Sequence, residues 1–141
     1  MAAYAVHELT VAINNTGETY SAIAGLETVD ITVNGEVQEW TELNNGGWKS
    51  RLLTGKDLEF SFSGKRIEGD TGNDYITSLV DEITTGANSS VKITWPNGDI
   101  LTVPCVVNVT SYGGGGSLDV GALEFSCLSN GQPTFSGNFS A

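Results

Sequence analysis

The clearest hydrophobic patterns lie near the middle of the chain. From Leu58 to Ser63, aromatic and aliphatic residues alternate with polar ones, which predicts a half-buried strand. The period then lengthens, and apolar residues spaced i, i+3, i+4 and i+7 predict one amphipathic helix over about 73–85. These helical positions are Ile76, Leu79, Val80 and Ile83. We expect Asn73 to cap this helix and Gly86 to end it.

Shorter alternations on both sides of this region bring the expected total to seven or eight strands. The predicted strands lie within residues 1–13, 20–34, 37–43, 57–63, 91–95, 100–110, 118–127 and 134–139. Asn34-Gly35 has the sequence of a tight turn between two of them. Many strands with a single helix predict a mainly β fold, a β-sandwich or partly open barrel with one flanking α-helix. We expect residues 1–141 to form a single domain.

A polar, glycine-rich stretch precedes the central strand, and we expect residues 44–56 to form a long loop. Loops of this length inside a compact domain are usually functional or mobile. Five of the six basic residues lie in or close to this stretch. They are Lys49, Arg51, Lys56, Lys65 and Arg66. An acidic chain with one basic segment could pair with copies of itself.

The overall charge is strongly negative, with 17 acidic and 6 basic residues and a formal net charge of −11. Such a chain repels nucleic-acid phosphates, which argues against sequence-specific binding of DNA or RNA. A merely solubilising surface is the alternative explanation for this charge. There is no apolar run long enough to span a bilayer and no signal sequence, so we expect a soluble protein made in the cytoplasm, without membrane insertion.

The residues that usually carry chemistry are sparse. Cys105 and Cys127 have no metal-ligand spacing and lie in apolar strand patterns, so we predict two buried reduced thiols, with a disulfide as the alternative. The single histidine, His7, would have to serve any Ser-His or Cys-His arrangement. The stretches around 55–57 and 70–81 depart from the phosphate-loop and calcium-loop patterns. We therefore expect no catalytic site, metal or cofactor.

Several motifs, in order along the chain, resemble one family. They are Val-Asp-Ile-Thr-Val at 29–33, Trp-Thr at 40–41, Phe-Ser-Phe-Ser-Gly-Lys-Arg at 60–66, Gly-Asp-Thr-Gly-Asn-Asp-Tyr-Ile at 69–76, Ser-Leu-Asp-Val-Gly-Ala-Leu-Glu-Phe at 117–125 and Gly-Gln-Pro-Thr-Phe at 131–135. With these motifs the chain resembles the major tail tube proteins of long-tailed bacteriophages, in particular those of phages of Gram-positive bacteria.

This resemblance implies six copies in a ring and rings stacked into a hollow tail tube, through which the phage DNA passes. It implies a negative lumen, and a long loop with terminal segments that hold neighbouring rings. The loop at 44–56 has the corresponding place, so Trp48, Lys49, Arg51 and Lys56 are candidate contacts between subunits or rings. The implied partners are the chain itself and the tape measure, tail terminator and distal tail proteins, and the implied location is the virion tail, assembled in the bacterial cytoplasm.

Alternation also predicts which residues face the lumen. Thr28, Asp30 and Thr32 lie opposite the apolar side of their strand, and Asp30 is the strongest lumen candidate, although an outer-surface position is the alternative. Asp119 and Glu124 differ in parity, so at most one of them can share a face without a bulge.

The competing functional class is a β-sandwich carbohydrate-binding or adhesion module. In such a module the three tryptophans would form a stacking platform, although core or interface roles are more common for tryptophan. They are Trp40, Trp48 and Trp95.

Overall fold

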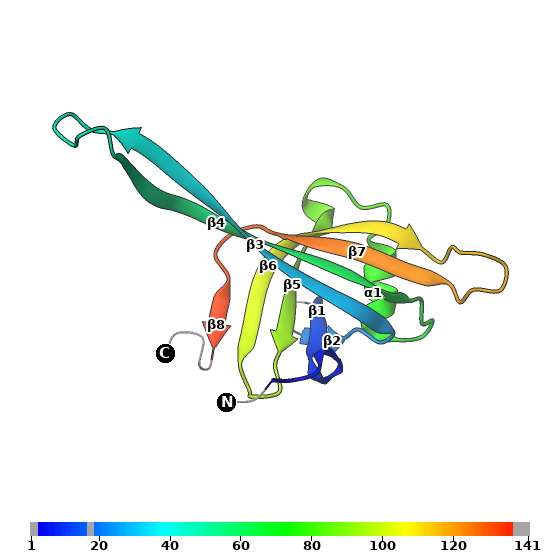
Figure 1. Ribbon diagram of the computed structural model, residues 1–141. Helices are drawn as coiled ribbons and strands as arrows, with labels where there is room; N and C mark the ends of the chain where they lie inside the picture. The colour runs from blue at the N-terminus through cyan, green and yellow to red at the C-terminus, as the bar shows by residue number, and fades with distance from the viewer. Residues whose placement is uncertain (1–2, 17–18, 137–141) are drawn as a thin grey trace.

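The computed structural model describes residues 3–16 and 19–136, which form mainly β-strands (Figure 1). In this part of the chain the strands are β1 (Thr10–Thr16), β2 (Thr19–Ala22), β3 (Leu26–Thr41), β4 (Lys49–Lys65), β5 (Asn88–Thr94), β6 (Ile100–Tyr112), β7 (Ala122–Ser129) and β8 (Thr134–Ser136). The helical segments are the α-helix α1 (Thr71–Ser78) and the short 3-10 helices η1 (Val6–Glu8) and η2 (Thr84–Ala87).

The strands form one antiparallel sheet in the order β2-β1-β5-β6-β7-β4-β3, and β8 pairs with β6 beside this path. Within the described residues the path does not close, because β2 and β3 lie at its two ends. The predicted fold class, mainly β with one flanking α-helix, is confirmed, and the sheet takes the open form.

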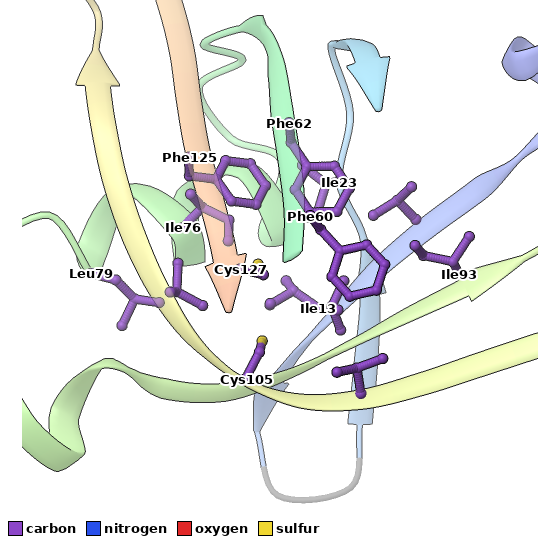
Figure 2. Packing of buried hydrophobic residues seen from close by; sticks show 14 of the residues in the cluster. Ile13, Ile23, Phe60, Phe62, Ile76, Leu79, Ile93, Cys105, Phe125 and Cys127 are labelled. Atoms are coloured by element: carbon purple, nitrogen blue, oxygen red, sulfur yellow. The ribbon is translucent and has the colours of Figure 1, made fainter. Parts of the chain in front are cut away.

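The core lies on one face of this sheet because alternate residues of neighbouring strands are apolar. Figure 2 shows Phe60 and Phe62 of β4 near Ile13 of β1 and Ile93 of β5. The sheet is therefore curved, so that strands distant in the sheet order contribute to one cluster of buried side chains. The rings of Phe62 and Phe125 stack with their centroids 4.9 Å apart.

The helix is shorter than predicted. It begins at Thr71 and ends at Ser78, because the backbone N–H groups of the next two residues bond to carbonyls three positions back, which tightens the turn. Of the four predicted apolar positions, Ile76 and Leu79 are buried, whereas Val80 and Ile83 are exposed. The predicted end at Gly86 is also wrong, since that residue lies in η2.

Asn73 is not the cap of this helix. The cap is Asp70, whose Oδ2 accepts from the backbone N–H of Asn73 at 3.0 Å and from that of Ala24 at 3.1 Å. The Asn73 side chain is instead fully buried and joins three segments. Its Nδ2 donates to the carbonyls of Ala24 and Lys65, at 2.9 and 3.0 Å. Its Oδ1 accepts from the Ile67 N–H at 3.2 Å and from the Arg66 guanidinium at 2.8 Å.

The predicted loop at 44–56 is largely strand. Strands β3 and β4 form one long hairpin whose last pair is Thr41 with Lys49, so residues 42–48 alone connect them and Lys49 to Lys56 belong to β4. The predicted turn at Asn34-Gly35 is wrong as well, because both residues pair across the hairpin. A Cβ on Gly35 would lie 3.0 Å from Leu53 Cδ1, so this glycine makes room for a cross-strand side chain.

The other boundaries differ modestly from the predictions. The predicted strand region 20–34 is divided into β2 and β3 at Gly25, whose φ is 81°. Strand β1 begins only at Thr10, and β7 only at Ala122. The predicted last strand is described as far as Ser136, and its remaining residues lie outside the described part.

The two cysteines are both buried as free thiols on adjacent strands. A hydrogen bond between Cys127 and Cys105, together with burial, holds the pKa of the Cys127 thiol well above its usual range. Cys127 is therefore protonated at neutral pH and belongs to the core.

Candidate assembly surfaces

The side of the sheet opposite the core carries a polar face across β3, β4, β7 and β6. Cross-strand pairing aligns its residues in three rows, which we call the polar sheet face. The rows are Thr28-Ser63-Glu124-Ser111, Asp30-Ser61-Ser126-Asn108 and Thr32-Glu59-Leu128-Val106. Ten of these twelve residues are polar or acidic, and none is basic.

The electrostatic character of this face is negative. Asp30, Glu59 and Glu124 are exposed, and no ion pair is formed by any of them with the described residues. The nearest base along β4 is Lys65, whose Nζ lies 3.4 Å from Glu27 Oε1 beyond the end of the rows. Three carboxylates on one face, without an ion pair among the described residues, form a surface that repels phosphates.

The three residues predicted to share one side of their strand do so. Thr28, Asp30 and Thr32 are exposed on the polar sheet face, opposite the apolar side of β3. Of the two acids considered for the later strand, Glu124 belongs to this face, whereas Asp119 lies outside β7. Sequence reasoning missed Glu59, although its alternation with Phe60 in the central strand was the signal for it.

A second surface is the distal part of the β3–β4 hairpin, residues 37–53, which we call the hairpin arm. Figure 1 shows that it projects away from the rest of the sheet. The arm is rich in large apolar residues that remain exposed, and Trp48 at its tip is 77% exposed. The others are Val37, Trp40, Leu43, Leu52 and Leu53. Exposed apolar side chains in this number are typical of a surface that binds a partner.

The bases of the arm have partners within the same chain. Arg51 Nε lies 2.8 Å from Glu39 Oε1, and Lys49 Nζ lies 3.5 Å from Glu39 Oε2. All three side chains are well exposed, so these pairs contribute little to stability. Lys56 lies nearer the body and forms no ion pair with the described residues. Contacts of these bases with another subunit stay a prediction.

The three tryptophans do not form a common stacking platform. Trp40 and Trp48 belong to the hairpin arm and its tip, whereas Trp95 is partly buried and packs against the core. Its Nε1 donates to the Tyr4 hydroxyl at 3.0 Å. A stacking platform made of all three tryptophans, as a carbohydrate-binding module would use, is therefore absent.

Groups that could hold a metal ion are not clustered in the described part of the chain. No helix there is long and apolar enough to cross a membrane.

Comparisons with known proteins point to one class. A family model described as phage tail tube protein matches residues 7–139. No curated protein sequence matches the chain. Similar folds occur in the tail of an empty gene transfer agent particle with C6 symmetry, at 24% identity over 96% of this chain and 100% of that chain, with a TM-score of 0.75.

Two further solved structures have the same fold. They are a virion of a native gene transfer agent, at 20% identity over 96% of this chain and 100% of that chain with a TM-score of 0.72, and the tube-terminating cap of the anti-feeding prophage, at 11% identity over 96% of this chain and 92% of that chain with a TM-score of 0.63. At these identities the structures support the fold, whereas the family match covers nearly the whole sequence. The chain belongs to the phage tail tube protein family and is a structural protein of the virion tail.

Proposed function

We propose that six copies of this protein form a ring, that the rings stack into the hollow tail tube, and that the phage genome passes through it into the host cell. The observation that carries this proposal is the polar sheet face. In a tube, the side of the sheet opposite the core is available to line the bore, and the acids there would keep DNA from adhering. The C6 symmetry of the structurally similar gene transfer agent tail supports the number six.

The charge pattern suits passage of DNA better than binding of DNA. A protein that binds DNA neutralises phosphates with Lys and Arg and releases counterions. Asp30, Glu59 and Glu124 have the opposite charge, and the hydroxyl and amide groups between them form only weak neutral contacts. Repulsion between exposed charges falls off over roughly 8 Å at physiological ionic strength. It therefore acts on DNA close to the wall, which is where adhesion would occur.

The hairpin arm supports the stacking of rings. It extends beyond the sheet and exposes apolar residues that a neighbouring ring could cover, with Trp48 at its tip. We further propose that the tube meets the tape measure protein inside and the tail terminator and distal tail proteins at its ends. The motif resemblance favours a long-tailed phage of Gram-positive bacteria as the source.

Electron microscopy of the purified protein at high concentration tests the assembly. Hollow rods or six-fold rings are expected, whereas a protein that stays monomeric and is retained by glycans would contradict the proposal.

A charge change in the polar sheet face tests the role of the lumen. Asp30→Lys should leave tubes intact but slow DNA release from phage particles, with a salt dependence that the wild type lacks. Glu68→Lys makes the same charge change at an exposed loop residue outside this face and serves as the control. Normal DNA release from the Asp30→Lys phage would place Asp30 outside the lumen.

A further inference from the structure

The core side of β3 continues into an open apolar groove beside β8. The groove has a volume of about 540 Å³, and its floor is formed by the buried Leu58 and Leu101. Its rim consists of Ile31, Val33 and Phe135, which all remain substantially exposed. We call these five residues the apolar groove. An exposed concave surface of this composition is typical of a binding site for another apolar surface.

Two charged residues of opposite sign, Lys56 and Asp57, line the edge of the apolar groove. Lys56 is exposed and forms no ion pair with the described residues. Side chains alternate along β4, so Lys56 projects on the same side as Leu58, whereas Asp57 projects toward the polar sheet face. The groove therefore presents an apolar floor with a positive charge beside it.

The symmetry of a ring limits what can occupy this groove. In a cyclic ring, each copy uses one surface toward one neighbour and a different surface toward the other. A groove that serves such a contact must have its complement elsewhere on the same chain. The complement should be apolar, exposed, negatively charged and located on the opposite side of the molecule.

The loop between β6 and β7, residues 113–121, meets these requirements. At its tip Leu118 is 99% exposed and Val120 is 61% exposed, with Asp119 between them. The loop has internal hydrogen bonds: Asp119 Oδ2 accepts from the Gly116 N–H at 2.8 Å, and the Asp119 N–H donates to the Gly116 carbonyl at 3.0 Å. A loop that is already ordered loses less entropy on binding.

Position and charge favour this loop over the tip of the hairpin arm. Figure 1 shows the β6–β7 loop at the end of the body opposite β8, as a head-to-tail contact requires. The hairpin arm projects on the side of β8, and its tip is followed by Lys49 and Arg51, which would bring further positive charge toward Lys56.

We propose that Leu118 and Val120 of one copy insert into the apolar groove of the next copy, where Asp119 pairs with Lys56. This inference rests on the proposed ring and assigns the contact that closes it. It also explains why large apolar side chains are exposed at two opposite ends of the folded body, in the apolar groove and in the β6–β7 loop.

Disulfide cross-linking tests this contact directly. A Val33→Cys/Leu118→Cys double variant should give, on mild oxidation, a ladder of covalent species up to six copies that disappears on reduction. Each single variant should give no ladder, and Cys105 and Cys127 are buried and should not contribute. The matched control is Glu68→Cys/Leu118→Cys, which keeps the loop cysteine but moves its partner away from the groove.

A charge exchange provides a second, independent measurement. Lys56→Glu and Asp119→Lys should each reduce the assembled fraction in sedimentation at least tenfold. The double exchange in one chain should assemble clearly better than either single variant, although the hydrogen bond from Gly116 to the Asp119 carboxylate stays lost. If wild-type tubes form but no ladder appears and both single charge variants assemble normally, the groove–loop contact is overturned while the proposed function stands. If the wild type forms neither rings nor tubes, both proposals fail.

Discussion

Replacement of Asn73 by alanine tests the buried junction that joins the helix to the sheet. The Asn73 amide bonds to the carbonyls of Ala24 and Lys65 and to the N–H of Ile67, so it holds the β2–β3 turn and the end of β4 against α1. In Asn73→Ala these three backbone groups lose their side-chain partner. Arg66 loses one bond as well, but it retains its ion pair with Asp74 at 2.8 Å.

The loss in the free energy of unfolding follows from the number of backbone groups that Asn73→Ala leaves without a hydrogen-bond partner. A buried polar group without its hydrogen bond costs about 1–3 kcal/mol, and groups near water lie at the lower end of that range. The junction is only partly buried apart from Asn73 itself, so three backbone groups at about 1 kcal/mol each give a loss of about 3 kcal/mol. Because single domains are stable by about 5–15 kcal/mol, this is a large fraction of the total.

Urea unfolding below the assembly concentration measures this loss, followed by tryptophan fluorescence and circular dichroism. The midpoint should fall for Asn73→Ala while the slope of the transition stays constant. Asn130→Ala is the matched control, since Asn130 is exposed and its backbone bond to the Pro104 carbonyl survives the change. Equal midpoints for the two variants would refute the role assigned to Asn73.

Two other predictions concern the helix and the basic segment. Leu79→Ala should lower the free energy of unfolding by about 2–5 kcal/mol because it leaves a cavity in the core. Ile83→Ala, at a 77% exposed position, should change it by less than about 0.5 kcal/mol. Equal melting temperatures for these two variants would contradict the packing of the helical segment against the sheet. The triple variant Lys49→Glu/Arg51→Glu/Lys56→Glu should keep its circular dichroism spectrum but fail to polymerise in sedimentation, since it removes three bases from the assembly surfaces; normal tubes would show that these bases make no essential contact.

Local alternation is sufficient to predict the strands that border the core. In residues 58–63 every second side chain is aromatic or aliphatic, and Leu58, Phe60 and Phe62 are indeed buried. The same alternation predicts that Asp30 lies on the polar side of its strand, and its exposed position on the polar sheet face agrees. Such patterns are reliable because one face of a strand must be apolar when the other meets water.

Alternation along the chain could not predict features that depend on contacts with residues distant in the sequence. Val80 and Ile83 continue the helical spacing of Ile76 and Leu79, but the chain leaves the core there to reach β5, and only the first two find a place against the sheet. Asn73 is a good local cap, yet its amide is used for backbone groups distant in sequence. Spacing along the chain contains no information about such partners.

A bulge in the hairpin determines on which side its charges lie. Glu36 pairs with Gly55 but Val37 pairs with Leu53, so Thr54 is an extra residue in β4, and its hydroxyl donates to the Glu36 carbonyl at 3.3 Å. An extra residue inverts the alternation of all positions beyond it on that strand.

The inversion separates the basic residues from the acidic face. If β4 alternated regularly through Thr54, Arg51 and Lys49 would project on the side of Asp30 and Glu59, where they would offer phosphates the contacts that the polar sheet face otherwise lacks. With the bulge, they pair instead with Glu39 on the side that continues from Ile31 and the apolar groove. The bulge thus keeps Arg51 and Lys49 off the proposed lumen surface and leaves them on the side that the proposed contacts between copies use.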